Sequence, residues 1–182
     1  MNRRQFLGIA GVVSVGGIVA GSALPARAAK GNVAMLPASV ASANDRNGVV
    51  LMDALRASLE KQGFTVLPAG NVNDALKNAN LQGQKILSTE QVAKIRDATG
   101  ADFVVYPRVL SVGLAQGDPT QMQATVLVNV QGKGKPNYIH TKQIGQVFAA
   151  GGASRQNAVI SRPAADEAAG RLLEGFYAKA GK

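Results

Sequence analysis

The sequence predicts a mixed α/β (α+β) domain of two layers, with helices packed on a mixed sheet of about five strands that ends in an antiparallel meander. Three observations support this fold class. Strand-like and helix-like stretches alternate over residues 32–100. Apolar and polar residues then alternate over residues 121–131, which indicates a strand with one buried face. From Ser161 onward an apolar stripe with helical spacing indicates a final helix.

The first half of the chain is expected to form three strands separated by helices. Short apolar runs predict strands at residues 32–37, 64–67 and 101–114. A helix from Gly48 should follow the first strand, because its leucines recur every four residues on one face. The stretch between the first strand and this helix is small and polar, so it is expected to be a loop. Alternating strands and helices predict partly parallel pairing with right-handed crossovers.

Two further helices are expected between the second and third strands. Asn73 is a plausible N-cap for a short helix at residues 71–81. Ser88 followed by Gln91 has the spacing of a capping box, which predicts the start of a helix that ends at Gly100. Asp102 follows that glycine and is expected to bind nearby backbone N–H groups.

The second half predicts a meander and a closing helix. Glycine and proline at residues 132–136 indicate a hairpin turn, and residues 138–149 should return as a strand with a bend near Gly145. The last helix is expected to begin near Ser161, with Pro163 in its first turn. The last three strands should therefore be antiparallel to one another.

The N-terminus predicts an export signal over residues 1–28. Arg3 and Arg4 precede an apolar run at residues 6–23, and Ala26 and Ala28 frame a small-residue cleavage site. The paired arginines favour the twin-arginine route. The alternative is a retained membrane anchor, because the run approaches the length that spans a bilayer. Cleavage would leave one domain at residues 29–182 in the periplasm or another extracytoplasmic space.

Composition limits the chemistry of the chain. It has 182 residues, no Cys and one His, so disulfides, Cys-ligated metals and a Cys nucleophile are excluded. A lipid anchor on a lipobox cysteine is excluded for the same reason. The residues indicate no cofactor and no metal site.

The order of elements resembles a known family of bacterial envelope domains. The stretch Gly100-Ala101-Asp102, an apolar strand, a meander and a last helix is its most telling part, after the early strands at residues 33–37 and 63–66. This pattern resembles the domain shared by the TolB N-terminal region, the curli secretion protein CsgG and LpoB. The resemblance implies a non-enzymatic interaction domain. The chain departs from the family in lacking a lipobox cysteine, a β-propeller and inserted pore hairpins.

Charge is distributed unevenly along the chain. The 20 basic and 11 acidic residues leave a net charge of +9, and removal of Arg3, Arg4 and Arg27 with the signal would reduce it to +6. Residues 119–165 contain five basic side chains and no acidic one. This predicts an interaction surface for an acidic protein, anionic lipid headgroups or a cell-wall polymer. Nucleic acid is not an expected partner, and the alternative is a solvated rim. The five residues are Lys133, Lys135, Lys142, Arg155 and Arg162.

Two other functions are weighed against this one. A secreted hydrolase would use Ser154 and His140, but Gln156 stands where the nucleophile-elbow pattern needs Gly, and no acidic residue lies between Asp118 and Asp166. A small-ligand carrier would instead need an apolar cavity of a few hundred Å³.

Overall fold

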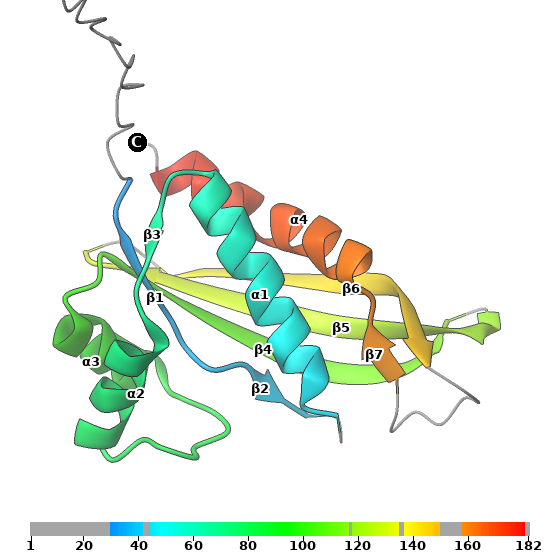
Figure 1. Cartoon of the computed structure of the whole chain (residues 1–182), viewed down its shortest axis with the longest axis horizontal. Helices are drawn as coiled ribbons and strands as arrows, with labels where there is room; N and C mark the ends of the chain where they lie inside the picture. Colours follow the sequence, from blue (N-terminus) through cyan, green and yellow to red (C-terminus); the bar gives the residue numbers. More distant parts are fainter. Residues whose placement is uncertain (1–29, 42–43, 117, 135–136, 150–157, 181–182) are drawn as a thin grey trace, which may run out of the picture.

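The computed structural model describes residues 30–41, 44–116, 118–134, 137–149 and 158–180, and Figure 1 shows their arrangement. The helices are α1 (Arg46–Lys61), α2 (Ala69–Asn78), α3 (Thr89–Thr99) and α4 (Arg162–Ala180). The strands are β1 (Asn32–Met35), β2 (Ser39–Val40), β3 (Thr65–Val66), β4 (Phe103–Ala115), β5 (Asp118–Gly132), β6 (Tyr138–Ala149) and β7 (Ala158–Ile160).

The sheet is mixed, as the sequence predicts. Its strand order is β3-β1-β4-β5-β6-β7, and β2 also pairs with β4. β1 is parallel to both β3 and β4, and β2 is parallel to β4. From β4 to β7 every pairing is antiparallel. The predicted fold class is therefore confirmed, including the meander.

Two short strands exceed the predicted number of about five. β2 lies in the stretch expected to be a loop and pairs with β4 through two residues. β7 lies just before α4 and pairs with the last three residues of β6. Strands this short have no periodicity of their own, because the neighbouring strand determines their conformation.

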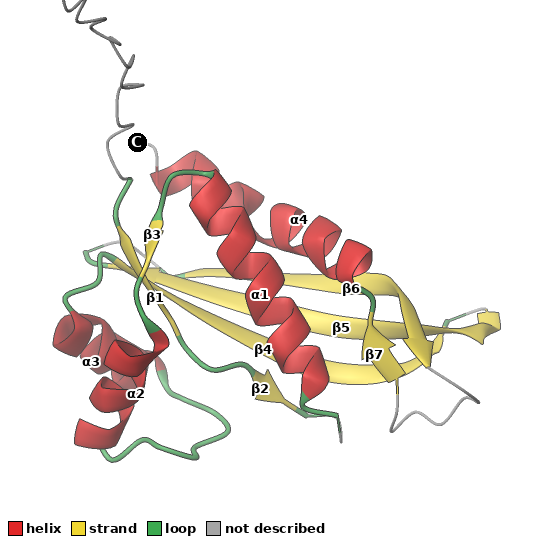
Figure 2. Cartoon of the chain, in the orientation of Figure 1, coloured by secondary structure: helices red, strands yellow, loops and turns green. Residues whose placement is uncertain are grey.

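The helices cover both faces of the parallel part of the sheet, where two layers were expected. Val33 and Met35 of β1 pack in one apolar cluster with α1 and α4. Ala34 and Leu36, which alternate with them, pack in a second cluster with α2 and α3. Successive strand residues point to opposite faces, so the region around β1 has three layers. Figure 2 shows the two helix pairs well apart, with the strands between them.

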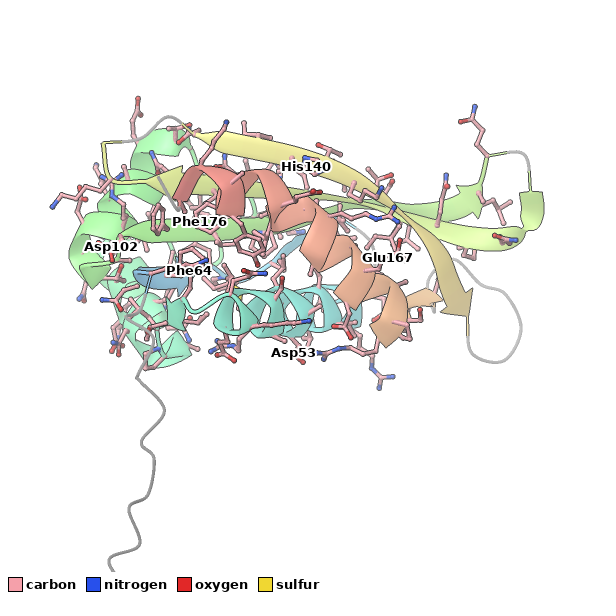
Figure 3. All side chains as sticks on the ribbon, turned by 90° about the horizontal axis from the view of Figure 1, so that it is seen from above. Asp53, Phe64, Asp102, His140, Glu167 and Phe176 are labelled. Atoms are coloured by element: carbon pink, nitrogen blue, oxygen red, sulfur yellow. The ribbon has the colours of Figure 1, made fainter. Side chains whose placement is uncertain are left out.

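Aromatic rings fill the core between α4, β4 and the strand that follows α1. The ring centroids of Phe64 and Phe176 are 5.1 Å apart, and those of Phe103 and Phe176 are 5.0 Å apart. The Phe103 and Phe176 rings meet edge to face, a favourable geometry for aromatic pairs. Figure 3 shows Phe64 and Phe176 close together beside the helix. This cluster fixes the C-terminal half of α4 against the sheet.

The helix ends follow the local sequence with one exception. The capping box is present: Ser88 Oγ accepts a hydrogen bond from the Gln91 N–H at 3.2 Å, and Gln91 Oε1 accepts one from the Ser88 N–H at 2.8 Å. The expected N-cap at Asn73 is wrong. α2 begins at Ala69, directly after Pro68. Pro68 has an extended backbone with a fixed φ, so it occupies the N-cap position of the helix. Asn73 lies inside α2 and is exposed.

The Gly-Ala-Asp stretch links α3 to the first strand. Gly100 ends α3 in the left-handed region at φ +65°, and Ala101 is buried. Asp102 Oδ2 then accepts a hydrogen bond from the N–H of Asn32 at 2.8 Å. The backbone N–H of Asp102 donates to the Asn32 carbonyl at 3.0 Å. The expectation that Asp102 binds backbone N–H groups is confirmed, and the contact aligns β4 with β1.

β4 and β5 are the longest strands, with 13 and 15 residues. They run on past the ends of α1 and α4 (Figure 1). Ser111 and Leu114 of β4 are exposed. β6 contains a register shift between Gly145 and Val147, which confirms the predicted bend near Gly145.

Candidate interaction surface

The structure separates the predicted basic residues. Lys133 follows the end of β5, where its backbone N–H donates to the Asp102 carbonyl at 3.0 Å. Arg162 begins α4, close to the end of β6 that pairs with β7. Lys142 lies between them on β6 and is half-buried. Lys135 and Arg155 lie outside the described residues, so Lys142 is the one of the five predicted residues that the structure places within a strand.

Arg162 is already paired. Its Nε donates to Asp166 Oδ1 at 2.9 Å, one helical turn away, and both side chains are about half exposed. An exposed pair of this kind contributes about 0.3–0.5 kcal/mol. The pair also reduces the positive charge that Arg162 offers to a partner.

β6 presents a backbone edge to its surroundings. One side of the strand pairs with β5 from Tyr138 to Val147. The other side pairs with β7 only from Val147 to Ala149. Among the residues that the structure describes, no strand pairs with the outer edge of β6 between Tyr138 and Gln146. Such an edge carries N–H and C=O groups that can bind another extended chain.

A groove runs along this part of the strand, between β6 and α4. It has a volume of about 360 Å³, and Figure 3 shows the helix alongside the strand, with His140 on β6 and Glu167 on α4. The groove is lined by Lys142, Ile144 and Gly145 from the strand and by Pro163, Ala164, Glu167, Ala168 and Arg171 from the helix. Glu167 Oε1 accepts from Arg171 Nη2 at 2.7 Å. The two cations and one carboxylate leave the groove with a net positive charge.

Of the two residues of the hydrolase hypothesis, the structure describes only His140. It lies on β6 opposite Val128 and does not line the groove between β6 and α4. Ser154 lies outside the described residues. Among those that are described, no group of three or more His, Asp or Glu side chains is arranged to hold a metal ion.

A pocket of about 420 Å³, with a lining more apolar than polar, lies at the carboxyl end of β1. Leu36, Tyr106 and leucines from α2 and from the loop between α2 and α3 line it, together with the polar side chains of Ser39, Asp45, Gln84 and Lys85. The Tyr106 hydroxyl donates to the Lys85 carbonyl at 3.0 Å and ties that loop to β4. The pocket has the size that the carrier hypothesis requires.

A third pocket of about 560 Å³ lies between α1 and α4 and is largely polar. At one end the hydroxyls of Tyr177 and Ser58 are 2.7 Å apart. Burial raises the pKa of Tyr177 to about 12, while the Ser58 hydrogen bond acts in the opposite direction. This hydroxyl therefore stays protonated at neutral pH and serves to join the two helices.

Sequence reasoning missed a row of buried polar atoms on the sheet face away from α1 and α4. Arg108 Nε, Asn129 Oδ1 and Gln131 Oε1 are buried without a hydrogen-bond partner among the described residues. Gln131 is only 8% exposed. The alternation in β5 predicts that Asn129 and Gln131 face solvent, but α3 lies close by, since Arg96 donates to the Gly132 carbonyl at 3.1 Å. Only the packing of α3 on the sheet reveals this burial.

The predicted signal residues Arg3, Arg4, Ala26 and Ala28 lie outside the described residues, as does the alternative span at residues 6–23. Within the described ranges, no helix is both long enough and apolar enough to cross a membrane.

Comparison with known proteins finds likeness in solved structures. The chain matches no protein-family model and no curated protein. It is similar to the hypothetical protein CT253 from Chlamydia trachomatis, with 14% identity, a TM-score of 0.51, and coverage of 84% of this chain and 98% of that one.

Two further structures are similar over a smaller share of this chain. The LpoB C-terminal domain from Escherichia coli has 18% identity, a TM-score of 0.46, and coverage of 65% of this chain and 84% of that one. Lipoprotein GNA1162 from Neisseria meningitidis has 17% identity, a TM-score of 0.46, and coverage of 63% and 80%. At such identities the likeness concerns the fold alone. The chain therefore has a mixed α/β fold similar to that of CT253.

Proposed function

We propose that this chain is an exported accessory protein of the bacterial envelope, which acts by binding another protein and catalyses no reaction itself. The observation that carries the proposal is the outer edge of β6, unpaired by any described strand and adjacent to Lys142. An unpaired edge offers backbone hydrogen bonds to another chain, and a nearby cation selects the charge of that chain.

The sequence pattern supports the same function. Gly100-Ala101-Asp102, followed by an apolar strand, a meander and a last helix, resembles the domain of TolB, CsgG and LpoB. Members of that family work as interaction domains in the envelope. In the structure, Gly100 caps α3 and Asp102 joins β4 to β1, so these residues of the pattern help to form the fold. That fold is similar to the fold of CT253.

Export places the protein where such a partner would lie. The proposal takes residues 1–28 as a cleaved signal and residues 29–182 as the working domain. The basic residues of the segment 119–165 then provide the partner-facing charge, with Lys133 directly after β5 and Lys142 on β6.

The test is capture of a partner by the exported protein. The protein, tagged at its C-terminus, is incubated with envelope extract at low and then at moderate salt, and captured proteins are identified by mass spectrometry. We expect a specific protein whose retention weakens with salt, because charge attraction between exposed groups is screened. Replacement of Lys133, Lys135 and Lys142 by Glu should abolish this salt-sensitive retention. Equal retention by the variant, or the absence of any specific protein, contradicts the proposal.

The apolar pocket favours one alternative function, a carrier of a small apolar ligand. Its leucine lining and volume of about 420 Å³ suit such a ligand. A fluorescent fatty-acid analogue tests this alternative. Saturable binding that is lost when Leu81→Trp fills the pocket would favour the carrier, and unsaturable or unchanged binding would reject it.

A further inference from the structure

We propose that the groove between β6 and α4 binds an extended acidic peptide segment of the partner protein, which adds to the sheet as a strand along β6. This inference rests on the proposed function and names the kind of partner surface that the domain recognises. Its parts are the edge of β6, the helix wall opposite, and the charge between them.

The strand edge provides the first part. Between Tyr138 and Gln146 the outer side of β6 has no paired strand among the described residues. An incoming strand at this edge would extend the sheet by backbone hydrogen bonds, a binding mode that does not depend on the side chains of the strand. The stretch is long enough for a segment of about eight residues at the usual rise of about 3.3 Å per residue.

The helix provides a wall for the side chains of the added strand. α4 presents Pro163, Ala164 and Ala168 to the groove. These small residues leave room beside the strand, and Ile144 gives the groove an apolar floor because it is buried. Since side chains of a strand alternate between faces, every second residue of the peptide would enter this space.

Charge selects an acidic segment. Lys142 comes from the strand side of the groove and Arg171 from the helix side. Glu167 accepts from Arg171 at 2.7 Å, which leaves the Lys142 ammonium as the excess charge of the groove. A carboxylate on the peptide would pair with Lys142, and no acidic residue in the segment 119–165 competes for it.

The same charge argues against a second copy of this chain as the occupant. Two copies paired edge to edge through β6 would bring their Lys142 side chains toward each other, and like charges in opposing positions destabilise a pair of strands. Anionic vesicles would attract Lys142 but offer no backbone groups to the edge of β6. An acidic extended peptide satisfies both the edge and the charge.

Glu167 allows a variant that fills the groove. It lines the groove from α4 and its side chain is 63% exposed, so a large side chain can be placed there without opening the core. Glu174 is the matched control, because it is also an exposed glutamate of α4 and does not line the groove. The two variants are Glu167→Trp and Glu174→Trp.

The experiment measures binding of a fluorescein-labelled peptide of about eight residues that alternates Glu with Val, a length that matches the stretch of β6 along which no described strand pairs. Fluorescence anisotropy reports affinity, and amide chemical shifts report the place of binding. We expect shift changes along β6 and the facing turns of α4. Lys142→Glu should weaken binding about tenfold, equivalent to about 1.4 kcal/mol, and Glu167→Trp should abolish it. Glu174→Trp and Lys94→Glu, at an exposed lysine of α3, should bind like the unaltered protein.

Several results would overturn the inference. They are absence of binding by the acidic peptide, equal binding of a Lys-Val peptide, equal binding by Glu167→Trp, and shift changes outside β6 and α4. Preference for anionic vesicles over the peptide, or self-association through β6 in sedimentation, would also overturn it. If the exported protein captures a partner that Glu167→Trp captures equally well, the groove is rejected while the proposed function stands. If no partner is captured at all, the proposed function itself fails.

Discussion

The side chain of Asn47 closes the outer edge of β7 by binding Ile160. Asn47 Oδ1 accepts from the Ile160 N–H at 2.7 Å, and its Nδ2 donates to the Ala158 carbonyl at 3.0 Å. The amide thus occupies the place of a neighbouring strand. It is fully buried at the start of α1 and fastens that helix to the last strand of the sheet, more than a hundred residues away in sequence.

We expect Asn47→Ala to lower the free energy of unfolding by about 2–3 kcal/mol, because two buried backbone groups lose their partners. Urea unfolding followed by circular dichroism measures the change. Asn73→Ala is the matched control, since Asn73 is exposed inside α2, and it should change stability by less than about 0.5 kcal/mol. A loss as small for Asn47→Ala as for the control would contradict the role assigned to this amide.

The left-handed cap at Gly100 predicts a second loss of stability. Gly100 has φ +65°, a conformation that a β-branched residue adopts only with strain. Gly100→Val should therefore destabilise the protein by about 1–2 kcal/mol. Gly170→Ala, at an exposed glycine inside α4 with free space around it, should have the opposite sign and stabilise by about 0.5–1 kcal/mol. Thermal unfolding of both variants tests this difference in sign.

Tyr177 predicts a pH dependence in the alkaline range. Its pKa in the folded protein is about 12, raised from 10.0 chiefly by burial. The contribution to stability is therefore fully present below pH 10.0 and is lost as the pH rises toward about 12, because only the unfolded chain gives up this proton in that interval. Tyr177→Phe should remove this part of the decline. Tyrosine ionisation in the unaltered protein and in Tyr177→Phe can be compared by absorbance titration. If the group missing from the variant titrates near pH 10, the raised pKa assigned to Tyr177 is wrong.

The proposed export signal predicts a defect in processing when its arginines are replaced. Replacing Arg3 and Arg4 together by Lys should leave the precursor uncleaved in the cytoplasm if the twin-arginine route is used. Immunoblots of cell fractions measure the precursor and the exported form, and N-terminal sequencing of the latter should begin at Ala29. Normal export of the double variant would instead assign the chain to the general route.

Features governed by near neighbours in sequence were predictable. Ser88 and Gln91 form the expected capping box because the two residues are three apart and need no tertiary partner. The meander follows from the alternation in β5, whose buried residues face α1 and α4. Long periodic segments of this kind determine which face is buried wherever they pack.

Features governed by distant contacts were not predictable. β7 forms where β6 and Asn47 meet it, and its three residues have no pattern that would reveal this. The sequence drew attention to Lys142 through the run of positive charge. It did not indicate the groove, because Glu167 and Arg171 reach the same place only when α4 packs beside β6.

The great length of β4 and β5 has a consequence for local opening. Their inner parts lie beneath helices and hold the buried valines, whereas beyond Met122, where the pairing of β5 with β6 ends, the described residues form a ribbon of two strands. A bare two-stranded ribbon is only marginally stable in water. Amide hydrogens around Ala115, which pairs with Asp118, should therefore exchange with deuterium orders of magnitude faster than those around Val105 and Val128, so that one ladder contains both strongly and weakly protected bonds.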